Sequence, residues 1–341
     1  MRKFNVAVVG ATGAVGEELF RVMEEVDFPV GELLPLASAK SAGTQIEFKG
    51  KNHKVVELTE TVFDEHEIDI AFFSAGGSVS EKYAKFAAAS GAVVIDNTSH
   101  FRMDADVPLV VPECNPQDIA QWKTRGIIAN PNCSTIQMVQ ILKPLDDAYS
   151  INRVDVSTYQ AASGAGKEGM EELVTQLQKF FEFKLDECEP KVFAHQLAFN
   201  VIPHIDVFLD NDYTKEEMKM VNETQKILHK NMEVSATCVR VPVLRSHSEA
   251  ITIHFDRDVD AAAAREVLRK APSIVVVDEP AANKYPMPSI SSDTNETYVG
   301  RIRTDNYRKN VLHLWCSADQ IRVGAATNAV RIAQKWIEMQ E

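Results

Sequence analysis

The stretch FNVAVVGATGAVG, residues 4–16, joins a strand pattern to a glycine-rich turn. Its opening residues are mostly apolar and β-branched, and the residues after the last glycine, up to Glu25, have helical spacing. Glycines between a strand and a helix let the backbone approach a pyrophosphate above the helix N-terminus. The spacing is G-x-x-G-x-x-G rather than G-x-G-x-x-G, so a tight turn without a ligand is the alternative interpretation. The stretch predicts the start of a Rossmann-like domain.

Strand and helix patterns alternate in the residues that follow this stretch. Apolar runs typical of strands occupy residues 32–37, 68–74 and 92–96, and residues 81–90 have helical spacing. This alternation predicts a doubly wound parallel sheet within an α/β fold. Ligands of such sheets bind beyond the carboxyl ends of the strands.

After residue 150 the strand patterns are grouped, with fewer helices between them, which predicts an α+β domain with a mixed sheet. An amphipathic helix over 324–339 is expected to pack on the first domain. We therefore predict a Rossmann domain over 1–130, completed by 324–341, and a second domain over 131–323. The strands expected in the second domain are 154–160, 200–203, 237–244, 250–256, 273–278, 298–303 and 311–317, and its helices are 169–183, 214–231 and 261–270.

The formal net charge of −13 and the five irregularly spaced cysteines exclude several classes of function. A nucleic-acid or anionic-membrane partner would require a basic face, whereas an anionic substrate needs only a locally positive pocket. The cysteine number is odd and no pair has C-x-x-C spacing, so neither a disulfide framework nor a metal site is expected. Without a signal-peptide pattern or a membrane-spanning apolar run, we expect a cytoplasmic protein.

The strand over 32–37 leads into Ser38-Ala39-Lys40-Ser41. An NAD-dependent enzyme usually has an acidic residue here for the ribose 2′-hydroxyl group. Hydroxyl groups and a lysine suit a 2′-phosphate instead, so we predict NADP as the cofactor. The alternative for Lys40 is a solvated loop lysine.

A second strand, turn and helix pattern, IIANPNCSTIQM over 127–138, places Cys133 in the first turn of a helix. Unpaired backbone N–H groups and the positive end of the helix dipole favour a reactive thiolate there. The alternative is a small buried residue without chemistry. A nucleophilic Cys133 requires partners from elsewhere in the chain.

His247 has the most distinctive setting of the nine histidines. It lies in the polar segment RVPVLRSHSEA, residues 240–250, between two predicted strands, and site residues often gather at such junctions. His247 is therefore the candidate base for Cys133. The alternative is an ordinary core or surface histidine.

Arg102 follows the strand over 92–96, so it lies at the predicted ligand-binding edge and suits a phosphate or carboxylate. A salt bridge with Asp104 or Asp106 is the alternative.

Glu216 and Lys219 are three residues apart on a predicted helix and share a face. Without a ligand they would be an exposed ion pair.

These segments resemble the aspartate-semialdehyde dehydrogenase family nearly end to end. The cysteine block and the segment from Arg240 to His247 are highly specific, whereas the glycine turn is not. The matching blocks are GATGAVG from Gly10, SHFRMD from Ser99, PNCSTIQM from Pro131, YQAASGAG from Tyr159, EEMK from Glu216, RVPVLRSHSEA from Arg240, VGRIRTD from Val299 and VGAATNAV from Val323.

The resemblance implies a role for each matching position. Cys133 would be the nucleophile that becomes an acyl-thioester, His247 its acid/base partner, and Gln160 would orient the substrate. Arg240 would hold the substrate carboxylate and Glu216 its amino group. The residues implied to bind phosphate are Arg102, Lys219 and Asn132. The predicted cofactor contacts are Gly10, Thr12, Gly13, Ala14, Val15, Ser38, Lys40, Ser41, Ser163, Gly164 and Gln320, the last replacing an Asn that is frequent in the family.

The activity implied is the reversible, NADPH-dependent reductive dephosphorylation of 4-phospho-L-aspartate to L-aspartate 4-semialdehyde. This reaction belongs to the biosynthesis of lysine and diaminopimelate, methionine, threonine and isoleucine. The domain over 1–130 would bind NADP, and the domain over 131–323 would carry catalysis and dimerisation in a homodimer.

Two other functions remain open at this stage. An N-acetyl-γ-glutamyl-phosphate reductase would use the same chemistry, but its acylated substrate amine would leave Glu216 without an ammonium partner. A non-catalytic NADP-binding sensor would use Cys133 as a redox-active thiol, although it would not require Gln160, Glu216, Lys219, Arg240 and His247 together.

Overall fold

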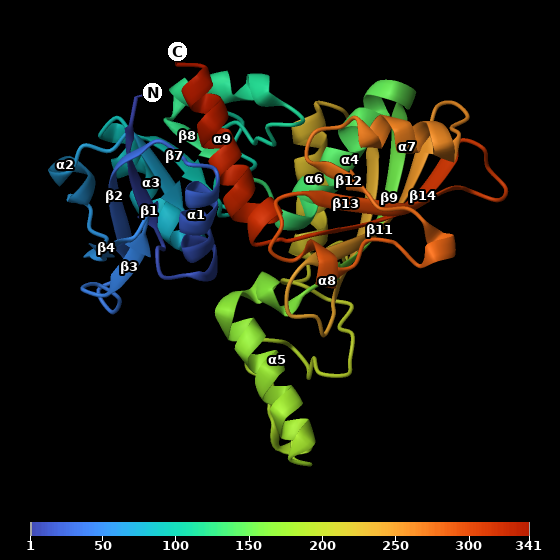
Figure 1. Ribbon diagram of the computed structural model, residues 1–341, viewed down its shortest axis with the longest axis horizontal. Coiled ribbons are helices and arrows are strands. Elements are labelled where there is room, and N and C mark those ends of the chain that lie inside the picture. Colours follow the sequence, from blue (N-terminus) through green and yellow to red (C-terminus); the bar gives the residue numbers. More distant parts are fainter. Residues whose placement is uncertain (1, 341) are drawn as a thin grey trace. The chain divides into compact units, whose positions relative to one another are not determined.

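A computed structural model describes residues 2–340, which form two compact units (Figure 1). The first unit takes the chain up to Asn132 and again from Ala325, and the second is Cys133–Gly324. The chain therefore leaves the first unit once and returns to it.

A parallel sheet of six strands forms the centre of the first unit, in the order β5-β2-β1-β6-β7-β8. Because the chain order reverses between β1 and β6, the carboxyl ends of these strands form the switch point where such sheets bind ligands. The predicted doubly wound sheet is confirmed. Its strands are β1 (Phe4–Val9), β2 (Val30–Ala37), β5 (Val56–Glu57), β6 (Ile70–Phe73), β7 (Val93–Asp96) and β8 (Ile127–Ala129).

The helices of the first unit cover this sheet, and the last of them comes from the far end of the chain. In Figure 1, α9 (Thr327–Glu338) lies in red among the blue and teal elements. Trp336 packs edge-on against Phe4 and Trp122, with ring centroids 6.2 Å and 5.5 Å apart, within the same buried core as β1 and α1. The other helices are α1 (Ala14–Glu25), α2 (Val62–Glu65), α3 (Gly77–Ala89) and a 3₁₀ helix, Pro116–Thr124.

The second unit contains the predicted mixed sheet, again of six strands, in the order β10-β9-β11-β14-β13-β12. The outer pairs β10–β9 and β12–β13 are parallel, and the pairs between them are antiparallel. The strands are β9 (Ile151–Gln160), β10 (Glu233–Arg240), β11 (His247–Phe255), β12 (Ile274–Val276), β13 (Thr297–Thr304) and β14 (Val311–Ala318). The helices are α4 (Cys133–Tyr149), α5 (Gly166–Phe181), α6 (Lys215–Leu228), α7 (Ala261–Arg269) and α8 (Pro288–Ser291).

Two local predictions were wrong, and one hairpin was not predicted. Residues 200–203 form no strand, because Phe199 has a left-handed φ of 60° and only Ile202 makes an isolated bridge, to Arg240. The strand expected over 237–244 is β10, which ends at Arg240, two residues before Pro242 removes a backbone donor. The hairpin of β3 (Gln45–Phe48) and β4 (Lys51–Lys54) was missed, since its sequence is polar and largely exposed.

Candidate active site

The glycine turn after β1 is shaped for close backbone approach. Gly10 has a φ of 88°, and a Cβ there would lie 2.8 Å from the carbonyl carbon and oxygen of Ser74. A Cβ at Gly16 would lie 2.2 Å from the Gly10 oxygen. Helix α1 has Gly13 as its N-cap, without a side-chain cap hydrogen bond. Its N-terminal backbone N–H groups therefore suit an anion such as a pyrophosphate.

A pocket of about 510 Å³ lies at this turn. It brings together Gly10, Thr12, Gly13 and Ser38 from the predicted cofactor set. No acidic side chain is among its lining residues, which fits a ribose carrying a 2′-phosphate better than a free 2′-hydroxyl group. The remaining lining residues are Val9, Ala37, Leu58, Ser74, Ala75, Val79 and Tyr83.

The other predicted cofactor residues of this unit are not part of the pocket lining. Ala14 and Val15 begin α1, and Lys40 lies exposed in a turn in which Ser41 donates its backbone N–H to the Ser38 carbonyl at 2.9 Å. Sequence reasoning missed Tyr83, which lies in α3 one helical turn beyond Val79. The available signal was the Gly-Gly-Ser loop after β6, at the carboxyl edge of the sheet.

Arg102 is held by the loop that follows β7. Its Nη2 donates to the Asn97 carbonyl at 2.9 Å, and the side chain is buried. Asp96 orders this loop by accepting hydrogen bonds from Ser80 Oγ at 2.8 Å and from the Thr98 N–H and hydroxyl groups at 3.0 and 2.9 Å. Burial raises the pKa of Asp96 despite these bonds and the nearby Arg102. The acidic residues considered as alternative partners of Arg102, Asp104 and Asp106, both bind Arg125.

Asparagine side chains fix the turn before the nucleophile. Asn130 donates to the Asn97 side-chain oxygen at 2.6 Å and accepts from Asn328 Nδ2 at 2.6 Å. Asn328 also donates to the Val110 carbonyl at 3.0 Å. Asn132, the predicted phosphate contact, is buried at the end of this turn. The turn is thus tied to β7 and α9 within the first unit.

Cys133 is the first residue of α4, in the second unit, as its sequence setting indicated. The last residue of that unit lies directly against it: a Cβ at Gly324 would be 2.5 Å from the Cys133 Cβ. Position 324 therefore tolerates no side chain. The start of a 17-residue helix provides the dipole and N–H groups that stabilise a thiolate or an oxyanion.

His247 begins β11 and is fully buried. Its Nδ1 accepts the Ala161 backbone N–H at 3.0 Å, which places the proton of the neutral ring on Nε2. Nε2 has no hydrogen-bond partner among residues 2–340. Burial and the charge of Arg240 lower the pKa of His247 well below its usual value, although the Ser246 backbone partly offsets them. The resting ring is neutral and offers Nε2–H as a donor.

Arg240 and Gly164 lie beside this imidazole. A Cβ at Gly164 would be 2.6 Å from Arg240 Nη1 and 3.1 Å from His247 Nε2. Arg240 Nη1 donates to the Ala161 carbonyl at 2.6 Å, and its guanidinium lies over the Phe193 ring at 5.7 Å. Burial lowers the pKa of Arg240, partly offset by Glu216 and Cys133. These residues converge from separate elements of the second unit.

Gln160, Glu216 and Lys219 form a continuous polar chain. Gln160 Nε2 donates to Ser134 Oγ at 2.6 Å and to Glu216 Oε1 at 3.3 Å. Lys219 Nζ lies 3.0 Å from Glu216 Oε2 and 2.8 Å from Asp206 Oδ2. Burial opposes the charge of Lys219, but the two carboxylates outweigh it and raise the pKa of Lys219. Glu216 is buried, which contradicts the exposed ion pair considered as the alternative.

Gln320 and Ser163 bond to each other. Gln320 Nε2 donates to Ser163 Oγ, and Gln320 Oε1 accepts the Ser246 backbone N–H at 2.9 Å. Gln320 thereby ties the loop of Ser163 and Gly164 to the residue before His247.

Two residues of this polar chain, Asp206 and Ser134, were not predicted from the sequence. Asp206 lies in an irregular segment with no motif, whereas Ser134 was signalled by its place beside Cys133 in the helix start.

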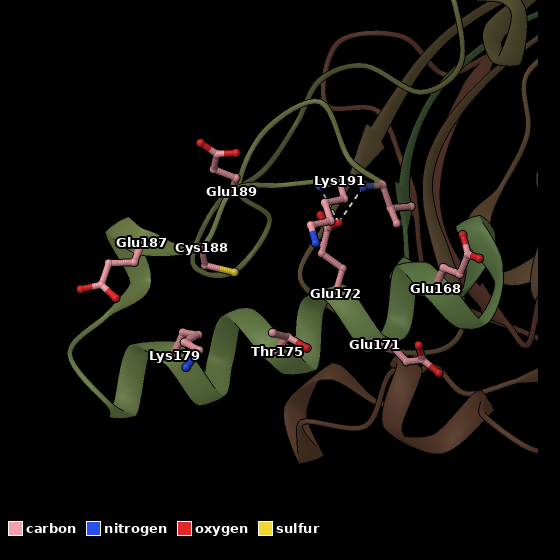
Figure 2. Close-up of a pocket in the computed structure, with 10 residues that line it drawn as sticks. Glu168, Glu171, Glu172, Thr175, Lys179, Glu187, Cys188, Glu189 and Lys191 are labelled. Atoms are coloured by element: carbon pink, nitrogen blue, oxygen red, sulfur yellow. Dashed lines mark hydrogen bonds between the residues drawn. The ribbon is translucent and has the colours of Figure 1, made fainter.

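A separate acidic pocket of about 670 Å³ lies between α5 and the segment that follows it (Figure 2). Glu172 points into the loop and accepts the backbone N–H groups of Lys191 and Val192 at 2.7 and 2.6 Å. This carboxylate therefore has a structural role, and the pocket shares no residue with the predicted site.

No helix within residues 2–340 is long and apolar enough to cross a membrane. The same residues contain no group of three or more histidine, cysteine or acidic side chains placed to hold a metal ion.

Comparison with known proteins places both units in one family. Residues 5–122 match the family model described as semialdehyde dehydrogenase, NAD binding domain, and residues 142–323 match semialdehyde dehydrogenase, dimerisation domain. The aspartate-semialdehyde dehydrogenase of Campylobacter jejuni is 75% identical over 338 residues, 99% of this chain and 98% of that protein. That of Aquifex aeolicus is 53% identical, over 98% of both chains.

Solved structures agree with these sequence relatives. Aspartate semialdehyde dehydrogenase II of Vibrio cholerae, complexed with ASA, superposes with a TM-score of 0.96 at 47% identity and 99% coverage of both chains. The enzyme of Candida albicans with NADP has a TM-score of 0.75 at 25% identity and 99% coverage of both chains. The resemblance seen in the sequence is confirmed, and the chain belongs to the aspartate-semialdehyde dehydrogenase family.

Proposed function

We propose that this protein reduces 4-phospho-L-aspartate to L-aspartate 4-semialdehyde, reversibly and with NADPH, through a thioester on Cys133. The observation that carries the proposal is the placement of Cys133 at the start of α4, in a unit that also contains buried His247, Gln160, Glu216 and Arg240. The 75% identical relative from Campylobacter jejuni supports the same reaction. The product would feed the biosynthesis of lysine and diaminopimelate, methionine, threonine and isoleucine, in the cytoplasm.

NADP fits the first unit. The glycine cradle and the uncapped start of α1 suit the pyrophosphate, and the pocket lining contains Ser38 but no carboxylate. Gly10, Thr12 and Gly13 would hold the cofactor there, with Ala14 and Val15 at the helix start, while Lys40 and Ser41 would approach the 2′-phosphate from the adjoining turn. When bound, the nicotinamide supplies or accepts the hydride.

Cys133 carries the covalent chemistry. In the direction of semialdehyde oxidation, its thiolate attacks the aldehyde carbon, and backbone N–H groups at the start of α4 stabilise the resulting oxyanion. Loss of hydride leaves a thioester, which phosphate attacks to release the acyl phosphate and regenerate the thiolate. His247 donates Nε2–H to the reacting oxygen, since its Nδ1 is occupied by the Ala161 N–H.

The charged side chains would select the substrate. Arg240 would bind the α-carboxylate as a fork, and buried Glu216 would bind the ammonium group. Lys219 would bind phosphate, and the family resemblance implies the same role for Arg102 and Asn132 of the first unit. Ser163, Gly164 and Gln320 would line the cofactor side of the site, with Gln320 acting through Ser163. An anionic Glu216 at this place disfavours an N-acetylated substrate.

The test is NADPH formation from L-aspartate semialdehyde and NADP, with and without phosphate, in the wild type and in Cys133→Ala. We expect phosphate-dependent turnover that the variant loses. Turnover on N-acetyl-glutamate semialdehyde alone would remove Glu216 and Arg240 from their proposed roles, and binding of NADP without any turnover would favour a sensor.

The second unit matches a family model for a dimerisation domain. We infer that the protein is a homodimer formed through this unit. Sedimentation at micromolar concentration should give twice the chain mass, and a concentration-independent monomer would contradict the inference.

A further inference from the structure

A second row of side chains crosses the mixed sheet beside the row of the active site. In the strand registers, Glu249 of β11 pairs with Thr158 of β9 and with Cys316 of β14. Alternate residues of a strand point to the same face. Glu249 therefore lies on the same face of the sheet as His247, and Thr158 lies on the same face as Gln160. Each is two residues along its strand from that site residue.

Glu249 is fully buried in this row, and its hydrogen bonding is incomplete. Cys316 Sγ donates to Glu249 Oε2 at 3.7 Å, whereas Glu249 Oε1 has no partner among the described residues. Gln137 of α4 lies against the same pair, with Nε2 donating to Cys316 Sγ at 3.8 Å, and its Oε1 also lacks a partner in residues 2–340.

Among residues 2–340, no cationic side chain contributes to the electrostatics of this carboxyl group. The neighbouring elements present Gln137 from α4, Thr158 from β9 and Cys316 from β14, while β11 itself presents His247, which is neutral. The next strand, β10, adds only the buried thiol of Cys238. An ionised carboxylate here would be desolvated with no opposite charge to compensate it. Burial accordingly raises the pKa of Glu249 to about 8, against the hydrogen bonds of Gln137 and Cys316, which lower it.

The same two elements carry the catalytic pair. Gln137 lies one helical turn after Cys133 on α4, and Glu249 lies two residues after His247 on β11. We propose that Glu249 is kept as a neutral carboxylic acid that, with Gln137 and Cys316, positions α4 against β11 and keeps negative charge out of a site that binds an anionic acyl phosphate. The catalytic part of this inference rests on the proposed function. Glu249 acts through its neighbours and is a positioning residue.

Infrared difference spectroscopy tests the protonation state directly. At pH 6 the wild type minus Glu249→Gln difference should contain the carbonyl stretch of a protonated carboxyl group, and this band should disappear as the pH rises past about 8. The matched control is Glu223→Gln, which alters another buried glutamate, on α6. This variant should keep the band, so the band should be absent from the wild type minus Glu223→Gln difference. A difference spectrum without the band would overturn the inference.

Kinetics test the positioning role. Glu249→Gln keeps size and neutrality, so kcat at pH 7 should stay within about threefold of the wild type, and the wild-type to variant ratio should fall severalfold between pH 7 and pH 9. Gln137→Leu should lower kcat about tenfold with little change in the KM for semialdehyde. Coincident pH profiles for wild type and Glu249→Gln would contradict the role. If no semialdehyde turnover exists, the proposed function fails, and the alkylation rates of Cys133 in the two proteins replace kcat.

Discussion

At the scale of single residues, the site depends on places where backbone lies against side chains. Gly324 leaves no room for a Cβ beside Cys133, and Gly164 leaves none beside Arg240 and His247. These close approaches restrict where the Cys133 side chain and the His247 ring can lie. Small changes at either glycine should therefore act on catalysis more than on ligand binding.

Gly324→Ala should lower kcat by about 100-fold, because the new methyl group must displace the nucleophile from its reacting position. The affinity for NADP should change little, because Gly324 is not among the residues proposed to contact the cofactor. Steady-state kinetics and a fluorescence titration with NADPH measure the two effects. An unchanged kcat would show that Cys133 moves freely against this residue.

His247→Gln should lower kcat by about 10²- to 10⁴-fold, the usual contribution of a general acid. Since Nε2 carries the proton, the imidazole does not generate the thiolate, and the rate at which iodoacetamide alkylates Cys133 should stay within a few-fold of wild type. Because burial and the charge of Arg240 lower the pKa of His247, the ring stays neutral at neutral pH and should add no limb there to the kcat profile. A parallel loss of alkylation would make His247 the base for the thiol.

The residues that could be predicted were those with a local signature. Cys133 stands at a recognisable helix start, and His247 stands in a polar segment between strands. Asp206 carries no such signature, because its role comes from an ion pair with Lys219 across an irregular segment. In the sequence, Glu249 is only an acidic residue near a histidine. Its neighbours in the fold are set by the registers of β9, β11 and β14, which the sequence does not reveal.

At the scale of elements, the alternation of strands and helices predicted the parallel sheet, and the grouping of strand patterns after residue 150 predicted the mixed sheet. The pattern failed where propensity and context disagree, as at residues 200–203, and where a hairpin is mostly exposed. The last helix was expected from residue 324, but α9 begins at Thr327, after a π-helical turn, Arg322–Ala326. Hydrophobic periodicity does not distinguish the two helix types.

Trp336→Ala tests how much α9 stabilises the first unit. The indole is 8% exposed and packs against Phe4 and Trp122, so its removal should destabilise that unit by about 3–5 kcal/mol. Urea unfolding followed by far-UV circular dichroism measures the change. A loss below about 1 kcal/mol would mean that the core closes over the missing ring.

Glu249, in the buried row with Thr158 and Cys316, makes the free energy of unfolding depend on pH. The pKa of Glu249 is raised from 4.5 to about 8, so its contribution to stability is fully present below pH 4.5 and is lost as the pH rises to about 8. The free energy of unfolding of the wild type, measured relative to that of Glu249→Gln, should fall by up to about 3 kcal/mol between pH 4.5 and pH 7. Unfolding of both proteins at pH 5 and pH 7.5 measures this difference, and a pH-independent gap would mean that Glu249 is ionised in the folded state.

At the scale of the whole molecule, the glycine turn proposed to hold the pyrophosphate and the proposed nucleophile Cys133 belong to separate units. Gly10→Ala should weaken NADP binding by at least about tenfold, because the left-handed φ and the contact with Ser74 both oppose a methyl group. Alkylation of Cys133 without cofactor should be unchanged. A variant that lost both properties would show that the first unit also shapes the thiol.

The return of the chain to the first unit has a consequence for synthesis. Helix α9 completes the core around β1 and α1, yet the ribosome makes it only after the entire second unit. The nascent Rossmann sheet therefore emerges with an unfilled apolar face and must wait for its own last helix, while residues 133–324 can fold first. The part of the chain that is made first can therefore complete its core only after the last helix has been synthesised.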